Sequence, residues 1–167
     1  MFSLLHRTDR FGLVSNVVVF TLLALISNGI IFVLGWSLSS DSSELQPVWA
    51  PPGWAIGVVW LVLLAALGAA RWFIVVREGK RRASGASWVT GLAVFCCLYP
   101  FWTLAFDSRF MGLIGNVLTL FLAGQVMGKV RNISKRATAI VALVVAWVTF
   151  ATVLLVRLIQ LNGSASN

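Results

Sequence analysis

The sequence predicts an all-α integral membrane protein built as a bundle of five transmembrane helices. Hydrophobic residues make up 59% of the 167-residue chain and charged residues only 11%, which is far from the usage of soluble domains. A bilayer core about 30 Å thick requires roughly 20 apolar residues at the helical rise, and the chain supplies five such stretches. None of them alternates strictly between apolar and polar residues, so helices are favoured over barrel strands.

The predicted spans cover residues 14–36, 53–76, 88–106, 111–130 and 137–159, within a single domain over residues 1–167. The first span follows Arg7 and Arg10, as a secretory signal would. Its apolar run is longer than a signal core, and Trp36 is followed by Ser37 and Leu38 instead of a small-residue cleavage site. We therefore expect this span to remain in the protein.

The second span has a distinctive beginning, where a proline pair stands among tryptophans. Proline is tolerated in the first helical turn because its missing N–H has no intrahelical partner there. Pro51 and Pro52 therefore fix the point at which the helix begins. Trp49, Trp54 and Trp60 make this segment a stiff entrance walled by aromatic rings.

The remaining spans are separated by loops of unequal charge. One side of the membrane would hold ten cations, namely Arg7, Arg10, Arg77, Lys80, Arg81, Arg82, Lys129, Arg131, Lys135 and Arg136. The other side keeps Arg109 and Arg157, beside Asp41, Glu44 and Asp107. The positive-inside rule places the amino terminus in the cytoplasm and the carboxyl terminus outside, and a bacterial inner membrane suits the lack of a cleavable signal. Topology and lipid headgroups explain the net charge of +8 better than nucleic-acid binding does.

The inventory of reactive side chains predicts no metal, no cofactor and no catalytic residues. His6 is the sole histidine, and the adjacent Cys96 and Cys97 form neither an ordinary disulfide nor a metal-ligand spacing. We expect both cysteines to be small packing residues. No acidic residue falls in the middle of a span, which disfavours a proton-driven pump.

Several polar and small residues within the spans have structural interpretations. Arg71 lies near the basic loop, so we expect its side chain to snorkel to the interface in preference to binding ligand. Bonds between helices are the expected role of the span amides, which are Asn16, Asn28, Asn116 and Gln125. The pairs Gly53/Gly57 and Gly124/Gly128 predict close helix contacts, within one bundle or in a homodimer.

The eight tryptophans fall into two groups. Those near span ends are interpreted as headgroup anchors, although Trp49 also belongs to the entrance; they are Trp36, Trp49, Trp72 and Trp88. Those inside spans are Trp54, Trp60, Trp102 and Trp147. Packing between helices and stacking against a large planar ligand in a shared cavity both account for the second group.

Three blocks of sequence resemble one family. Trp49, Pro51, Pro52, Trp54, Gly57 and Trp60 match the signature that opens the second helix of tryptophan-rich sensory proteins, also called translocator proteins or the TspO/MBR family. Residues 99–106, followed by Arg109, Met111 and Gly112, are similar to its third-helix block, and residues 146–152 with Leu161 and Asn162 are similar to its fifth-helix motif. Order and spacing agree from about Pro47 to Asn162.

The resemblance implies a five-helix bundle of the TspO type whose cavity binds porphyrins, and in some members sterols or drug-like ligands; many members are dimers. The ligand-binding positions carried over are Trp54, Ile56, Tyr99, Trp102, Trp147 and Ala151, and the lid positions are Pro47, Trp49, Pro51 and Pro52. Tyr99 stands where the family has an asparagine and Ile56 where it has a phenylalanine. Leu143 and Val144 replace a proline and a tyrosine.

Three functions follow from these residues. The first is a membrane receptor or carrier for a planar apolar ligand, a porphyrin, held between Trp54, Trp102 and Trp147. The second is light- or oxygen-dependent porphyrin breakdown, which needs no metal and no acid–base pair. The third is a regulatory or structural membrane protein with a decayed site, favoured by Tyr99, Leu143 and Val144. Sterol is a weaker candidate because Tyr99, the single tyrosine, has no Lys or Arg in the next five residues.

Overall fold

The computed structural model describes residues 4–34, 45–105 and 108–163. After a 3₁₀ turn, η1 (Leu4–His6), it contains five α-helices: α1 (Arg10–Val33), α2 (Gly53–Val75), α3 (Arg82–Ala105), α4 (Arg109–Val130) and α5 (Lys135–Gly163). All five are long and apolar enough to cross a membrane, and the described residues include no strand. The predicted all-α bundle of five transmembrane helices is confirmed. Trp36, Asp41, Glu44 and Asp107 lie outside the described residues.

The second, fourth and fifth helices begin close to the predicted positions, whereas α3 begins at Arg82 instead of residue 88. Gly79 adopts a left-handed backbone conformation with φ of 118°, which favours glycine and allows a tight reversal after α2. The start of α5 is fixed by Ser134, whose side chain accepts a hydrogen bond from the N–H of Ala137 at 3.3 Å.

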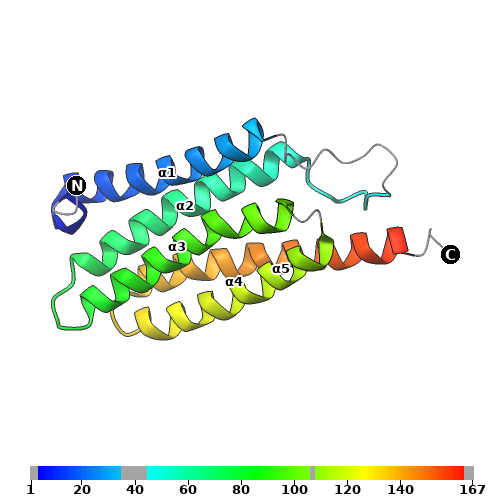
Figure 1. Cartoon of the computed structure of the whole chain (residues 1–167). Helices are drawn as coiled ribbons and strands as arrows, with labels where there is room; N and C mark the ends of the chain where they lie inside the picture. The colour runs from blue at the N-terminus through cyan, green and yellow to red at the C-terminus, as the bar shows by residue number, and fades with distance from the viewer. Residues whose placement is uncertain (1–3, 35–44, 106–107, 164–167) are drawn as a thin grey trace.

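Successive helices run in opposite directions, and α2 contacts three of the other four helices (Figure 1). It packs against α1, α3 and α5, while α4 packs against α3 and α5. Leu67 and Ile74 of α2, Val89 of α3, Val126 of α4 and Val141 of α5 are fully buried where these helices meet. Cys96 and Cys97 belong to the same buried cluster, as expected of small packing residues. Because lipid chains are as apolar as these side chains, close packing holds the bundle together.

The two ends of the bundle differ in charge. The basic end carries η1 and the α2–α3 and α4–α5 turns, and it holds the ten cations grouped by the sequence. The opposite end, which we call the lid end, carries residues 45–52 and the end of α5. In Figure 1 the amino terminus lies at the basic end, and α5 continues beyond the other helices at the lid end.

The basic end contains a buried arginine. Arg71 is only 7% exposed, and its Nη1 donates to the carbonyl of Leu5 at 2.7 Å and to Oδ1 of Asn16 at 2.7 Å. Its Nε donates to the hydroxyl of Thr90 at 3.1 Å. The prediction that Arg71 snorkels to the interface is therefore wrong. Three oxygen acceptors from η1, α1 and α3 surround the guanidinium inside the bundle, so the side chain gains nothing by extending outward.

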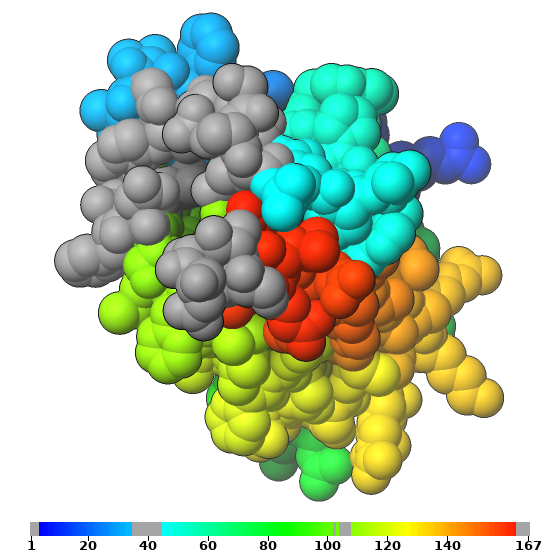
Figure 2. Space-filling model, turned by 90° about the vertical axis from the view of Figure 1, so that its right-hand side faces the viewer, coloured from blue at the N-terminus to red at the C-terminus, as the bar shows by residue number. Residues whose placement is uncertain are grey.

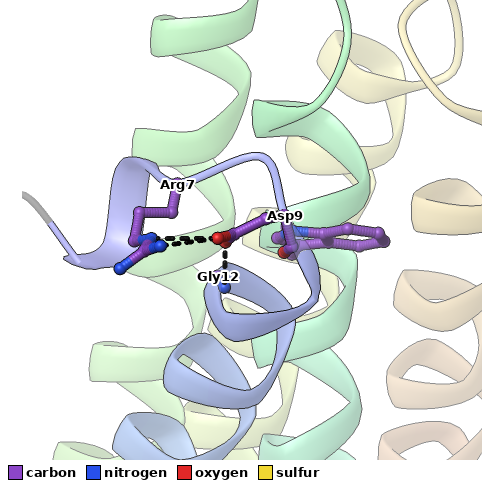
Figure 3. Close-up of polar contacts among 4 residues, drawn as sticks. Arg7, Asp9 and Gly12 are labelled. Carbon is purple, nitrogen blue, oxygen red and sulfur yellow. Dashed lines mark hydrogen bonds and ion pairs between the residues drawn. The ribbon is translucent and has the colours of Figure 1, made fainter.

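Hydrogen bonds also hold the first turn of α1 in place at the basic end (Figure 3). Asp9 accepts a hydrogen bond from the N–H of Gly12 at 2.9 Å and pairs with Arg7 at 2.6 Å. The Arg7 guanidinium, and then the Gly12 N–H, lower the pKa of Asp9 from its ordinary value of 3.8. This contribution to stability is present above the unfolded-state pKa and is lost as the pH falls through the lowered one. The indole of Trp72 also donates to the Asp9 carbonyl at 3.2 Å, which links this turn to α2.

The contacts predicted for the polar and small residues of the spans are found for some of them and not for others. Asn16 bonds across helices to Arg71, and Asn116 accepts from the Tyr99 hydroxyl at 3.4 Å, as predicted. Asn28 and Gln125 are instead exposed. Gly124 and Gly128 are also exposed, and a Cβ at either position would meet nothing within 4 Å. This glycine pair therefore makes no close helix contact within the bundle, and the homodimer remains a prediction.

Gly68 makes the close contact between α1 and α2, and its replacement tests the packing. A Cβ at Gly68 would lie 2.6 Å from the backbone carbonyl oxygen of Asn16. Since backbone must move to admit it, we expect Gly68→Ala to lower the free energy of unfolding by about 1–3 kcal/mol. Denaturant titration in detergent, followed by circular dichroism, measures the change. Gly124→Ala is the matched control and should be neutral or slightly stabilising, because alanine favours helix. Equal stability of the two variants would contradict the packing described here.

Candidate functional site

The lid end is organised by residues 45–52, which we call the lid segment. Pro47 is buried and begins a turn in which the N–H of Ala50 donates to its carbonyl at 2.9 Å. Pro52 is the N-cap of α2, so the proline pair does precede the helix as the sequence indicates. Trp49 projects from the turn and is 49% exposed.

One side chain fastens the lid segment to α5. The amide of Asn162 donates from Nδ2 to the carbonyl of Leu45 at 3.1 Å, and its Oδ1 accepts from the N–H of Leu45 at 3.1 Å. Nδ2 also donates to the Leu158 carbonyl at 3.0 Å, which fixes the side chain on its own helix. Figure 2 views the bundle from the lid end and shows the lid segment against the last turns of α5.

A row of three aromatic rings leads from the lid segment to α5. The ring of Trp49 meets that of Phe150 edge-on, with centroids 5.8 Å apart, and Phe150 lies 5.4 Å from the ring of Trp147. Trp147 is half-buried, and its Nε1 is buried without a hydrogen-bond partner among the described residues. A buried donor without an acceptor is costly, so this N–H is a natural contact for an acceptor atom on a ligand.

Deeper in the bundle, Tyr99 occupies the space between α3 and α4. Its ring stacks against Phe95 at 6.4 Å and meets Trp60 edge-on at 6.1 Å. A Cβ at Gly115 would lie 2.6 Å from the tyrosine ring, so the missing side chain at Gly115 makes room for it. The hydroxyl is satisfied by Asn116. This residue is therefore a packed core aromatic as well as a predicted site residue.

An open groove runs beside the lid segment along α5. Its volume is about 280 Å³, and it is lined by Trp49, Thr152, Val153, Val156, Arg157 and Gln160. Nη1 of Arg157 donates to Oε1 of Gln160 at 3.3 Å. The groove therefore combines an aromatic wall, an aliphatic floor and a cation.

Comparison with known proteins agrees with this architecture. The sequence model of the TspO/MBR family matches residues 16–161. The chain belongs to the TspO/MBR family. A curated relative, the tryptophan-rich protein TspO of Chlorobaculum tepidum, is 27% identical over 121 residues, which cover 71% of this chain and 76% of that protein. Membership supports a membrane sensory or binding protein, and the sequence resemblance to the family is confirmed.

The ligand positions carried over from the TspO/MBR resemblance lie in different environments. Trp54, in the first turn of α2, is 72% exposed, and Ile56 is half-buried. Ala151 is half-buried on α5, one residue after Phe150. The side chain of Trp102 lies outside what the structure describes. Convergence of Trp54, Trp102 and Trp147 on one pocket therefore remains a prediction.

Two positions that depart from the family pattern differ sharply in exposure. Leu143 is 56% exposed, and Val144 is fully buried in the core. Sequence reasoning did not single out Phe150 or Arg157 as site residues. Phe150 lies within the fifth-helix motif, but its contact with Trp49 depends on how the lid segment folds back.

The lid end offers several kinds of group for contact with a ligand. Within the described ranges, no three His, Cys, Asp or Glu residues come together as they would to hold a metal ion. Aromatic faces, an indole N–H and one guanidinium are the groups that a ligand would meet.

The contact between Asn162 and Leu45 can be tested by removing the amide. Asn162→Leu keeps the approximate size of the side chain but loses both hydrogen bonds to Leu45. We expect faster amide hydrogen exchange in peptides covering residues 45–50, since a lid segment without these bonds opens more often. Mass spectrometry of the protein in nanodiscs measures the rate, and Asn28→Leu is the matched control at an exposed position. Unchanged exchange in Asn162→Leu would show that other contacts hold the lid segment.

Proposed function

We propose that this protein is a membrane receptor or carrier for a planar apolar ligand, a porphyrin or related tetrapyrrole, bound at the lid end. The observation that supports this most directly is the buried Nε1 of Trp147, which has no acceptor among the described residues. A pyrrole nitrogen or a peripheral oxygen of the ligand would accept its hydrogen bond. The rings of Trp49 and Phe150 would stack against the macrocycle in offset geometry.

Specific contacts contribute more than apolar burial to the affinity of a ligand that comes from the membrane. A ligand that arrives from water gains about 25 cal/mol for each Å² of apolar surface removed from it. A ligand that arrives from the bilayer has already gained most of this, because lipid chains are apolar too. Aromatic stacking and the bond to Trp147 therefore decide whether it prefers the protein to lipid.

The charge distribution supports one orientation. The basic end would face the cytoplasm, because cytoplasmic loops carry an excess of Lys and Arg. The lid end and the carboxyl terminus of α5 would then face the opposite side, and the lid segment would receive ligand there. We propose a bacterial inner membrane as the setting.

Tyr99 favours a second candidate, a regulatory membrane protein that has lost its ligand. Its ring fills the region between α3 and α4 beside Gly115, at the position of the family asparagine. Under this alternative the protein would not bind porphyrin at any concentration tested. Under the first proposal the ligand lies nearer the lid segment, where Tyr99 does not obstruct it.

Quenching of tryptophan fluorescence by protoporphyrin IX separates these proposals. We expect saturable quenching of the protein in nanodiscs and a dissociation constant raised about twofold to tenfold in Trp147→Phe, which keeps a ring but lacks the N–H. Trp88→Phe, at the basic end beneath Lys129, is the control and should bind as the unsubstituted protein does. An equal affinity of the two variants would exclude a role for the Trp147 N–H, and absence of saturable quenching would favour the second candidate.

A further inference from the structure

The basic end carries a dense group of cations on two turns that lie far apart in the sequence. The α2–α3 and α4–α5 turns, with the helix ends beside them, hold eight exposed cations, which we call the basic surface: Arg77, Lys80, Arg81, Arg82, Lys129, Arg131, Lys135 and Arg136. Glu78 is the single carboxylate within residues 77–82 and 129–136. Among the described residues the ion pair given by geometry joins Arg7 and Asp9, so no described carboxylate is paired with the basic surface.

Side-chain packing joins the two turns, which lie at the amino-terminal end of the bundle in Figure 1. A Cβ at Gly85, in the first turn of α3, would lie 2.8 Å from Cδ1 of Ile133 in the α4–α5 turn. The missing side chain at this buried glycine therefore lets the turns approach. Arg82 precedes Gly85 by three residues on the same face of α3, and Lys135 follows Ile133 by two residues. Cations of both turns thus flank one contact.

Two of the eight cations lie against aromatic rings of the other helical hairpin. Nζ of Lys129, on α4, lies 5.6 Å from the ring centroid of Trp88 on α3. Cζ of Arg136, on α5, lies 5.4 Å from the ring centroid of Phe73 on α2. Attraction to the ring faces holds these long side chains in place. Because Trp88 and Phe73 belong to helices that cross the membrane, the cations lie at the depth of the lipid headgroups.

Helix stability does not account for the placement of these cations. Arg82 is the first residue of α3 and Lys135 the first of α5, and neither helix has an acidic residue in its first turn. A cation at this position opposes the helix dipole, which favours negative charge there. The positive-inside rule accounts for the side of the membrane on which the cations lie, but it does not account for the convergence of the two turns. An external anion would relieve the repulsion among them.

A hollow at the α2–α3 turn provides space beside the cations. Its volume is about 500 Å³, and it is lined by Glu78, Gly79, Lys80, Arg82 and Ala83. Two of these side chains are cationic, and both are exposed. An anionic group in the hollow would therefore meet Lys80 and Arg82 on one side and the α4–α5 turn on the other.

We propose that the basic surface binds an anionic phospholipid whose headgroup carries two linked phosphates, in preference to lipids with one phosphate. One phosphate lies in the hollow against Lys80 and Arg82, and the other lies against Lys135 across the contact between the turns. A hydroxyl on the link between the phosphates donates to the Glu78 carboxylate. The occupant is a lipid and not a free phosphate, because the basic surface lies at headgroup depth. This proposal is independent of the ligand at the lid end.

Two lipids that differ in their number of phosphates test this preference. Diphosphatidylglycerol carries two phosphates, and phosphatidylglycerol carries one. Native mass spectrometry of the full chain in detergent, titrated with each lipid, measures the bound fraction. We expect the unsubstituted protein to bind diphosphatidylglycerol about fivefold or more tightly, since each cation near a headgroup contributes about that factor. In Arg82→Gln/Lys135→Gln the preference should be lost, while the melting temperature in phosphatidylcholine nanodiscs stays the same and shows that the variant is folded.

A matched control separates this site from diffuse electrostatics. Arg10→Gln/Arg157→Gln removes the same charge from exposed positions outside the basic surface and should keep the preference. Equal losses of preference in the two double variants would overturn the site. Equal binding of the two lipids by the unsubstituted protein would overturn it as well. Excess inorganic pyrophosphate tests the other source of linked phosphates: retention of the lipid supports the proposal, and displacement would assign the surface to a free anion and contradict it.

Discussion

A buried arginine that has no carboxylate partner among the described residues fixes one end of this bundle. An unpaired cation within a membrane protein is costly, and it is tolerated only where oxygen atoms replace its hydration. For Arg71 these oxygens belong to Leu5, Asn16 and Thr90, which lie in η1, α1 and α3. Separation of any one of these elements from α2 would remove one of the three acceptors of the guanidinium. Opening the bundle at the basic end therefore has a high cost in free energy.

The lid end is held in a different way. The lid segment is joined to α5 by the two neutral hydrogen bonds between Asn162 and Leu45, and by the ring contact between Trp49 and Phe150. Such bonds are individually modest when water can replace them. Because one end is fixed and the other is lightly fastened, we propose that a ligand would enter at the lid end. The unpartnered N–H of Trp147 and the exposed cation of Arg157 lie along α5 at that end.

Hydropathy was sufficient to predict the five spans, because a helix that crosses lipid must be apolar over its whole length. The proline pair was sufficient to predict the beginning of α2, because proline is tolerated at the start of a helix. Contacts between residues far apart in the sequence could not be predicted in this way. The bond between Arg71 and Leu5 spans 66 positions in the sequence, and the bond between Asn162 and Leu45 spans 117. Likewise, nothing near Tyr99 in the sequence indicates that Gly115 leaves space for its ring.

We propose that ligand binds at the lid end, against α5, and leaves the basic end unchanged. The indole ¹⁵N–¹H spectrum of the protein in micelles tests this directly, since each tryptophan gives one signal and Trp-to-Phe variants assign it. On titration with protoporphyrin IX, the account predicts that the signals of Trp49 and Trp147 shift while those of Trp72 and Trp88 stay in place. Shifts at Trp72 and Trp88, with Trp49 and Trp147 unmoved, would contradict it.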